Sequence, residues 1–237
     1  MPFDGRRILV TGASKGIGYA VAAELAERGA RVFALSRSAT SAAHGNIEPV
    51  GVDLADTAAL EAAVSARLPL DGLVNCAGVV EVEPFLEAGM ANLRTTMDVN
   101  FAAPFRLGQL VAGDCVDRGR GASIVNVSSI AAEVGTPGHA VYCASKAALD
   151  SLTRVMAVEL GPYGIRTNTV NPVVTWTPMA QKAWSDPDKA AAMKARIPMG
   201  RFAEPHEVAA AVRYLLSEQA SMVNGVSLPV DGGFTAG

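Results

Sequence analysis

Residues 8–18 read ILVTGASKGIG, and a helix-forming segment, YAVAAELAERG, follows from residue 19. The apolar start is typical of a buried strand, and the glycines mark a tight loop between that strand and the helix. Gly12 allows the chain to turn off the strand, Gly16 lets the main chain approach a pyrophosphate, and Gly18 allows close packing of the helix. The order of strand, glycine loop and helix predicts a dinucleotide site at the helix N-terminus.

Short apolar segments recur along the chain and alternate with segments of helical periodicity. The expected strands are 8–10, 32–35, 50–52, 73–74, 124–127 and 169–170, with a last strand near 226–230. The expected helices are 19–28, 57–68, 93–118 and 140–160. Strands that are apolar on both faces need helices on both sides. The sequence therefore predicts a single α/β domain over residues 1–237, a doubly wound Rossmann fold with about seven parallel strands.

The composition excludes several classes of protein. Hydrophobic residues make up 50% of the 237 residues and charged residues 18%, which is typical of a globule with a large core rather than of a disordered chain. The net charge of -3 provides no basic surface for nucleic acid or anionic membranes. No apolar run reaches the ~18 residues of a membrane helix. We expect a small-molecule partner, and neither nucleic acid nor a membrane.

The cysteines and the first residues bear on the cellular environment. Cys76, Cys115 and Cys143 are spaced like neither a zinc site nor a disulfide framework. The first residues, MPFDGRR, lack the apolar core of an export signal. We therefore expect no metal centre and a reducing, cytoplasmic environment.

Residues 173–200 differ in composition from the rest of the chain. Both tryptophans, Trp176 and Trp184, lie there among methionines and prolines. Asp186 followed by Pro187 is typical of a helix start, because the carboxylate accepts from free amides and proline suits the first helical position. We interpret the segment as a lid over the substrate; the alternative is a packed surface excursion.

The end of the second expected strand indicates which dinucleotide binds. An NAD site places an Asp or Glu there to accept from the ribose 2′-hydroxyl, but this chain reads Ser36-Arg37-Ser38. Arg37 offers a fork of donors to a 2′-phosphate, and Lys15 adds a second positive charge from the glycine loop. The sequence thus predicts NADP(H); the alternative is that both cations are solvated surface residues.

Two further strand ends carry polar or small residues where a dinucleotide would lie. Asp53 and Leu54 follow the third strand; Asp53 can accept from an adenine amino group, and its alternative role is to start a helix. Asn75, Ala77 and Gly78 follow the fourth strand. Small residues let the main chain pass close to the cofactor, and Asn75 is expected to fix the loop through bonds to main chain.

Tyr142 and Lys146 are four residues apart in the helix expected over 140–160, so their side chains lie on one face. An ammonium group beside a phenol stabilises the phenolate and is expected to lower the pKa of Tyr142 toward neutral pH. Ser129 follows a buried strand and can orient a carbonyl group. Asn100 lies in a long helical segment, where a buried amide would kink or hydrate the helix. Alone, the Tyr-Lys pair would more often be a solvated helix face.

From the glycine loop to the DGG segment at 231–233, the whole chain resembles the short-chain dehydrogenase/reductase family. The motifs SR at 36–37, HAVYC at 139–143, WSDP at 184–187 and IPMGRF at 197–202 resemble its L-xylulose (dicarbonyl) reductase and tetrameric carbonyl reductase branch. The resemblance implies a catalytic tetrad. Its members are Asn100, Ser129, Tyr142 and Lys146, and Ser129 rather than Ser128 is assigned because of its spacing from the tyrosine.

The implied reaction is hydride transfer from NADPH to a ketone, dicarbonyl compound or ketose, which yields the alcohol. Tyr142 would protonate the developing alkoxide while Ser129 holds its oxygen. Lys146 would also bind the nicotinamide ribose, and Asn100 would hold a water that links Lys146 to solvent.

The resemblance also implies ligand contacts. His139 and Trp184 would line the substrate pocket; the alternatives are a loop histidine and a buried lid anchor. Val173 stands where the family usually has glycine, which would narrow the site. The residues assigned to the cofactor are Gly12, Lys15, Gly16, Ile17, Gly18, Ser36, Arg37, Asp53, Leu54, Asn75, Ala77, Gly78, Tyr142, Lys146, Thr175 and Thr177.

A homotetramer is implied as well, and the apolar stripe over 140–160 is wider than one sheet face needs. Two other functions remain open. A reductase of 3-oxoacyl thioesters on an acyl-carrier protein would need a basic patch beside the cleft. An NADP-sensing binding protein would have a broken tetrad.

Overall fold

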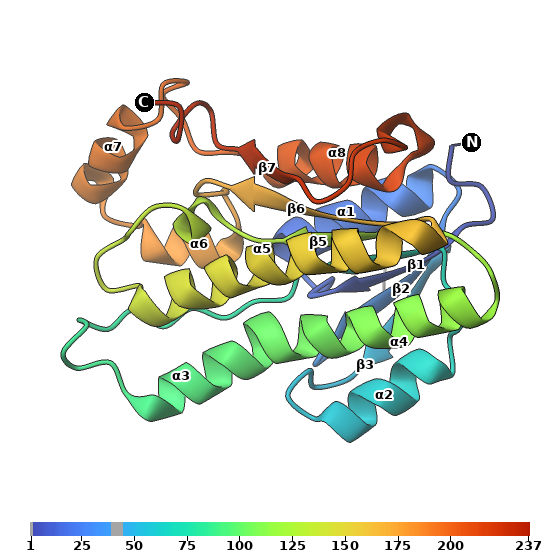
Figure 1. The fold of residues 1–237 in the computed structure, drawn as a ribbon. Coiled ribbons are helices and arrows are strands. Elements are labelled where there is room, and N and C mark those ends of the chain that lie inside the picture. The colour runs from blue at the N-terminus through green and yellow to red at the C-terminus, as the bar shows by residue number, and fades with distance from the viewer. Residues whose placement is uncertain (1, 39–44) are drawn as a thin grey trace.

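The structure is a computed structural model, and it describes residues 2–38 and 45–237. Seven parallel strands form one sheet in the order β3-β2-β1-β4-β5-β6-β7. The strands are β1 (Arg7–Thr11), β2 (Arg31–Ser36), β3 (Ile47–Gly51), β4 (Gly72–Asn75), β5 (Ala122–Val127), β6 (Ile165–Pro172) and β7 (Ser227–Val230). The expected doubly wound α/β fold is confirmed (Figure 1).

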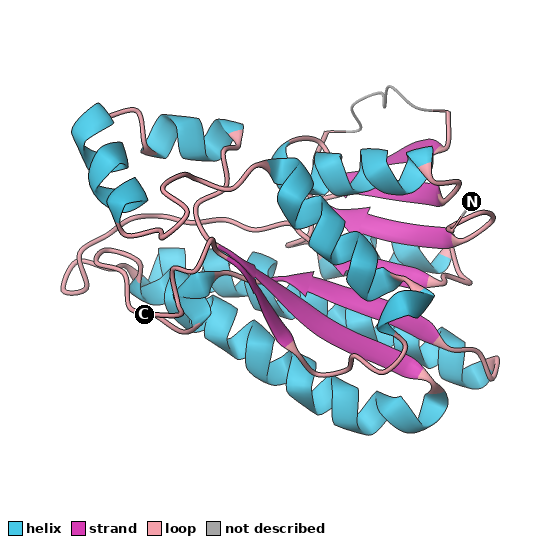
Figure 2. Ribbon diagram, turned by 90° about the horizontal axis from the view of Figure 1, so that it is seen from above, coloured by secondary structure: helices cyan, strands magenta, loops and turns pink. Residues whose placement is uncertain are grey.

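Helices cover both faces of the sheet, as the view from above in Figure 2 shows. On one face, α1 (Gly16–Glu27) packs beside α8 (Pro205–Leu216). On the other face, α4 (Ala103–Asp117) lies between α2 (Thr57–Ser65) and α5 (Ala140–Leu160). No helix in the described ranges is both long enough and apolar enough to cross a bilayer.

The side chains of β1 show why the strands are apolar throughout. Ile8 and Val10 pack into the core under α1 and α8, whereas Leu9 packs into the core under α2 and α4. Successive side chains of a strand point to opposite faces, so a strand with a helical layer on each side contributes to two cores.

The sheet has a switch point between β1 and β4. The strands numbered after β1 run outward on one side as β2 and β3, and on the other side as β4 to β7. Connections therefore leave the carboxyl ends of β1 and β4 in opposite directions, which opens the crevice where doubly wound proteins bind ligands. The glycine loop follows β1 at this point.

The segment 93–118, expected to be one helix, is interrupted. Helix α3 (Met90–Met97) is joined to α4 by a π-helical turn, Asp98–Ala102. Asn100 lies in this turn and is fully buried. The uninterrupted helix expected over 93–118 is wrong, because the chain widens into a π-helical turn at Asn100, whose side chain bonds to Val79 outside the helix.

Between β6 and α8 the chain forms two short helices, α6 (Pro178–Ala183) and α7 (Pro187–Ala195). Asp186 caps α7 as predicted, since its carboxylate accepts from the N–H groups of Asp188 and Lys189 at 2.9 and 3.3 Å. Apolar residues of this region pack with Ile130, which follows β5, in a third cluster apart from the two sheet cores: Ile130, Val173, Ala190, Ile197, Phe202 and Ala203.

Helix α8 was not among the expected helices. Pro205 occupies its first turn, and the carboxylate of Glu207 accepts from the N–H of Glu204 at 2.8 Å. A proline at the first position with a glutamate two residues later is a helix start signal, and it identifies α8 in retrospect.

Candidate active site

A cavity of about 400 Å³ opens at the carboxyl ends of the strands. Most residues assigned to the cofactor line it, although they come from many separate elements. Those residues are Gly12, Lys15, Gly16, Ile17, Gly18, Ser36, Arg37, Asp53, Leu54, Ala77, Gly78, Tyr142, Lys146 and Thr177. Asn75 and Thr175 are buried and lie outside its lining.

The glycine loop is shaped by contacts that no side chain would permit. A Cβ on Gly12 would lie 2.8 Å from the Cα of Ala77, and a Cβ on Gly18 would lie 2.5 Å from the carbonyl oxygen of Gly12. Gly16 adopts a φ of +61°. The close partners of Gly12 and Gly18 are backbone atoms, so a side chain would push the loop away from the segment after β4 and distort the cradle.

The N-terminus of α1 offers free N–H groups to an anion. Lys15 is its N-cap residue and makes no side-chain cap bond, and the first turn carries no acidic residue. The helix dipole and these free donors favour a phosphate group. Thr177 faces the loop, because a Cβ on Gly16 would lie 3.1 Å from its Cγ2. These features fit the pyrophosphate of a dinucleotide.

Thr11 holds the segment after β4 in place, a role that the sequence analysis missed. Its Oγ1 accepts from the N–H groups of Cys76 and Ala77 at 3.0 and 3.1 Å. Asn75, which we expected to bond to main chain, instead donates to the side-chain oxygen of Asn126 at 2.8 Å. That expectation is wrong because Asn75 is paired with Asn126 across neighbouring strands, which places the two side-chain amides within hydrogen-bond distance.

Ser36 and Arg37 lie at the end of the cavity next to β2. The Ser36 hydroxyl donates to the carbonyl oxygen of Ser38 at 2.6 Å, which shapes the turn that carries Arg37. Arg37 is exposed and forms no ion pair with another residue in the described ranges. Its guanidinium is therefore free to meet a ligand phosphate.

Asp53 and Leu54 line the same end of the cavity. The carboxylate of Asp53 accepts from the N–H of Ala55 at 3.0 Å, which stabilises a turn. Helix α2 is instead capped by Asp56, whose carboxylate accepts from the N–H of Ala59 at 3.0 Å. Asp53 therefore does not start the helix, and its position at the cavity suits an adenine contact.

Tyr142 and Lys146 project from α5 toward the cavity. Lys146 is 4% exposed, and its Nζ donates to the carbonyl oxygen of Val127 at 2.9 Å. The Nζ lies 5.7 Å from the centre of the Tyr142 ring. Burial lowers the pKa of Lys146 to about 8, because the charged ammonium loses its hydration.

Burial also sets the pKa of the Tyr142 phenol. It raises the pKa of Tyr142 to about 12, and hydrogen bonding from the Ser129 hydroxyl opposes this rise. The expected lowering toward neutral pH is therefore not found, because the loss of hydration exceeds the effect of the neighbouring groups. Tyr142 is protonated at neutral pH, which is the form that donates a proton. Ser129 is fixed in turn, since its Oγ accepts from the N–H of Ala131 at 3.1 Å.

The side chain of Asn100 joins three segments. Its Oδ1 accepts from the N–H of Val79 at 2.8 Å, and its Nδ2 donates to the carbonyl oxygen of Val79 at 2.9 Å and to Ser145 Oγ at 3.1 Å. A Cβ on Gly78 would lie 3.5 Å from Asn100 Oδ1 and 3.6 Å from Lys146 Nζ. Both amide N–H groups are used in protein bonds, so the side chain fixes the loop after β4.

The two residues implied for the substrate, His139 and Trp184, contact different aromatic rings. The ring of His139 is edge-on to that of Tyr142, with 6.4 Å between ring centres. Trp184 packs on Phe202 at 5.6 Å between ring centres and does not line the cavity. Val173 packs into the third apolar cluster rather than into the cavity lining, so it does not narrow this cavity.

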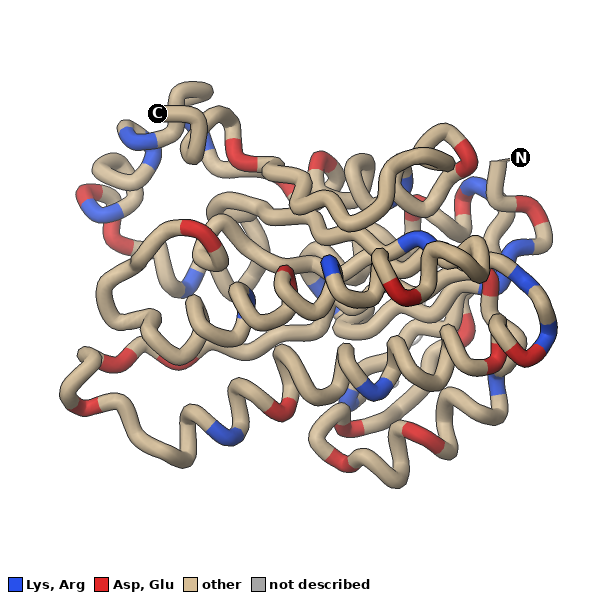
Figure 3. Tube along the Cα trace, in the orientation of Figure 1, with Lys and Arg blue, Asp and Glu red and all other residues tan. Residues whose placement is uncertain are grey.

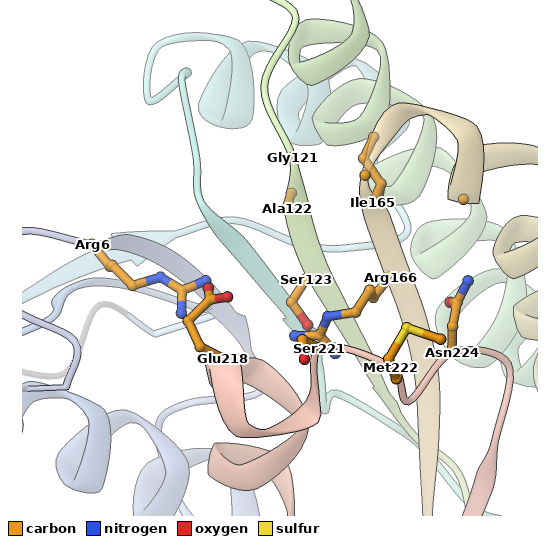
Figure 4. Close-up of a pocket in the computed structure, with 12 residues that line it drawn as sticks. Arg6, Gly121, Ala122, Ser123, Ile165, Arg166, Glu218, Ser221, Met222 and Asn224 are labelled. Atoms are coloured by element: carbon orange, nitrogen blue, oxygen red, sulfur yellow. The ribbon is translucent and has the colours of Figure 1, made fainter.

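A second cavity, of about 510 Å³, lies near the amino ends of β5 and β6 (Figure 4). Arg6 and Arg166 line it. Arg6 donates to the carbonyl oxygen of Leu216 at 2.9 Å, and Arg166 donates to that of Leu215 at 2.8 Å. Both guanidinium groups thus cap the last turn of α8, which is a structural role.

Comparison with known proteins identifies the family. A model of the family described as "Enoyl-(Acyl carrier protein) reductase" matches residues 12–235. D-erythrulose reductase from Gallus gallus is 50% identical over 99% of this chain and 97% of its own length. L-xylulose reductase from Bos taurus is 49% identical over 98% of this chain and 97% of its own.

A solved structure supports the same relationship. It is described as an NAD(P)-dependent gluconate 5-dehydrogenase from Beutenbergia cavernae with NADP bound at low occupancy. It is 34% identical, covers 100% of both chains and has a TM-score of 0.94. This chain therefore belongs to the short-chain dehydrogenase/reductase family, in the branch that holds L-xylulose reductase.

Proposed function

We propose that this protein uses NADPH to reduce a small ketose or dicarbonyl compound to its alcohol. The observation that carries the proposal is the position of Tyr142. Its protonated phenol lies beside the Ser129 hydroxyl and the Lys146 ammonium, at a cavity that fits a dinucleotide. The similarity to reductases of D-erythrulose and L-xylulose supports a polyhydroxylated ketone as the substrate class.

When bound, NADPH supplies the hydride that adds to the carbonyl carbon. The Ser129 hydroxyl donates to the carbonyl oxygen and holds it near Tyr142. Tyr142 gives its proton to this oxygen as negative charge develops there. The ammonium of Lys146 stabilises the phenolate that remains, and Asn100 keeps the loop around Lys146 in place.

The choice of NADPH rests on Arg37 and Lys15. Both are exposed at the cavity, and no carboxylate follows β2 where an NAD site would have one. A 2′-phosphate would form charge-assisted hydrogen bonds with Arg37. The related Beutenbergia structure, which holds NADP, supports the same choice.

Reduction of an acyl-carrier-protein thioester is the second candidate, and the description of the matching family model names such a reaction. The cations beside the lid do not form a free basic patch. Lys189, Lys194 and Arg196 lie 4.9, 5.1 and 4.8 Å from the ring centres of Trp184, Phe202 and Phe234. The acidic Asp188 also lies next to Lys189 in the first turn of α7, and acidic and basic segments adjoin in this part of the chain (Figure 3). An acidic carrier protein would therefore find few unengaged cations there.

The complete set of Asn100, Ser129, Tyr142 and Lys146 argues against a binding protein that only senses NADP. We further propose that the enzyme acts as a homotetramer in the cytoplasm. Its three cysteines are free thiols, as a reducing compartment requires. The implied contacts of His139 and Trp184 with substrate belong to this proposal.

A substrate panel tests the proposed function. Diacetyl, L-xylulose, other ketoses and an acetoacetyl thioester are compared by the loss of NADPH absorbance. We expect kcat/KM to be highest for a ketose or for diacetyl. A higher kcat/KM for the thioester would favour the second candidate, and no turnover of any carbonyl compound would contradict the proposal.

A further inference from the structure

A buried polar cluster lies behind the catalytic serine, and the proposed reaction does not use it directly. Asp150 of α5 and Asn171 of β6 are 4% and 1% exposed. Asp150 Oδ2 accepts from Asn171 Nδ2 at 2.8 Å and from Ser227 Oγ at 3.3 Å. Its other oxygen, Oδ1, is buried and has no hydrogen-bond partner in the described ranges. A buried carboxylate with an unused oxygen opposes folding, so stability alone does not explain Asp150.

The amide of Asn171 connects Asp150 to the catalytic serine. Its Nδ2 donates to Asp150 Oδ2 and also to the carbonyl oxygen of Ser129, at 3.3 Å. Both neighbours are acceptors, so only the NH₂ group can face them, and Asn171 Oδ1 is left without a hydrogen-bond partner. Asp150 therefore fixes the orientation of the amide that holds the main chain of Ser129.

This anchor bears on catalysis because Ser129 must keep its hydroxyl beside Tyr142. The carbonyl oxygen of Ser129 also accepts from the N–H of Ala132 at 3.0 Å. The carbonyl group of Ser129 is thus held by two donors, Asn171 Nδ2 and the N–H of Ala132, while its hydroxyl acts on the phenol of Tyr142. A small displacement of a reacting group lowers the rate far more than it lowers substrate binding.

Asp150 also lies one helical turn from Lys146, on the same helix. The groups that act electrostatically on Lys146 are Cys76 and Asp150, and the ring of Tyr142 faces it. Burial raises the pKa of Cys76 and of Tyr142 to about 12, so both are neutral at physiological pH. Of these groups, Asp150 is therefore the one whose carboxylate supports the positive charge of Lys146.

We propose that Asp150 is a positioning residue for carbonyl reduction: its carboxylate orients Asn171, which anchors Ser129, and its negative charge favours the ammonium form of Lys146. This role rests on the proposed function, because it acts through Ser129 and Lys146. It assigns two separable effects to one carboxylate, one on geometry and one on charge.

Two variants separate these effects. Asp150→Asn removes the charge and keeps the side-chain shape, so we expect the high-pH loss of kcat to move to lower pH by about one unit. Asn171→Ser removes the anchor and keeps the charge, so we expect kcat to fall about tenfold with the pH profile unmoved. Ser227→Ala is the matched control, because it removes a bond to the same carboxylate oxygen but leaves both effects in place.

The measurements are kcat between pH 6 and pH 10 with NADPH and L-xylulose, and the melting temperature of each variant. A merely structural role would lower the melting temperature and leave kcat and the pH profile as in the wild type, which would overturn the proposal. Wild-type kcat in Asn171→Ser would overturn the anchoring role whether or not Asp150→Asn folds. Tyr142→Phe, assayed in parallel, separates the proposed function from the role of Asp150. If Tyr142→Phe is fully active, the proposed function fails. If Tyr142→Phe is inactive and Asp150→Asn behaves as the wild type, only the role of Asp150 fails.

Discussion

Burial sets the charge that Lys146 carries. The pKa of Lys146 is lowered to about 8, below its ordinary value of 10.5. The folded state thus binds this proton less tightly than the unfolded state, so the charged ammonium destabilises the fold below pH 8. Its destabilising contribution disappears as pH rises from 8 to 10.5. The catalytic charge of the folded protein is lost earlier, around pH 8.

We therefore expect reductase activity to fall above pH 8 without loss of folded protein. About nine-tenths of Lys146 would be neutral one pH unit above its pKa, which corresponds to a fall in kcat of about tenfold at pH 9. The test is kcat against pH, with circular dichroism at each pH. A constant kcat from pH 7 to pH 9.5 would show that this charge does not support the reaction.

Arg37 is the second side chain whose role can be tested alone. Arg37→Asp places a carboxylate where an NAD site has one, and it repels a 2′-phosphate. A charge-assisted hydrogen bond contributes ~1.5–3 kcal/mol. We therefore expect kcat/KM for NADPH, divided by kcat/KM for NADH, to fall by about tenfold to a hundredfold. Arg118→Asp is the control, because it makes the same charge change at an exposed ion pair with Asp114. Equal use of both cofactors by the wild type would contradict the assignment.

Among elements, the connection between β1 and the segment after β4 depends on one hydroxyl. Thr11→Val keeps the β-branched shape but leaves the N–H groups of Cys76 and Ala77 without their acceptor. Each unpaired N–H costs ~1–3 kcal/mol, so we expect the melting temperature to fall by about 5 °C or more and KM for NADPH to rise. Thr11→Ser retains the acceptor and should stay close to the wild type in both measurements. If Thr11→Val were as stable as Thr11→Ser, the hydroxyl would not hold the loop.

Sequence patterns located the elements whose defining residues lie close together in the chain. The loop at 12–18 lies within one short segment, and so does the pair Tyr142 and Lys146. The carboxyl ends of parallel strands meet at one edge of the sheet, which brings the two segments to the same cavity. The bond from Thr11 to Cys76 spans 65 positions, and no local pattern predicts such a pairing. The π-helical turn at Asn100 could not be predicted from local sequence either, because Asn100 bonds to Val79 in another segment.

The same distinction explains the error over Tyr142. The spacing to Lys146 predicted a lowered pKa, because a sequence shows which charges are near but not how much water is excluded. Burial raises the pKa of Tyr142 to about 12 instead. The polar cluster around Asp150 was also out of reach of sequence analysis, since its members come from α5, β6 and β7.

For the whole molecule, we expect the exposed apolar side chains on α4 and α5 to be covered in the proposed tetramer. Phe105, Val155 and Val158 are 41%, 49% and 77% exposed. The two helices lie side by side on one face (Figure 1). We expect sedimentation at micromolar concentration to give a mass about four times the chain mass of 24.4 kDa, and Val158→Arg to reduce it. A wild-type mass of one chain would contradict the tetramer.

Single-turnover kinetics of Tyr142→Phe shows whether Tyr142 is the proton donor on which the proposed reaction depends. NADPH affinity is measured by fluorescence, and the rate of NADPH oxidation by L-xylulose is measured by stopped flow. Tyr163→Phe, which removes an exposed phenol beyond α5, is the control. We expect Tyr142→Phe alone to lower the rate by about 10²–10⁴-fold, with NADPH affinity within about threefold of the wild type. A rate equal to that of Tyr163→Phe would contradict this role of Tyr142.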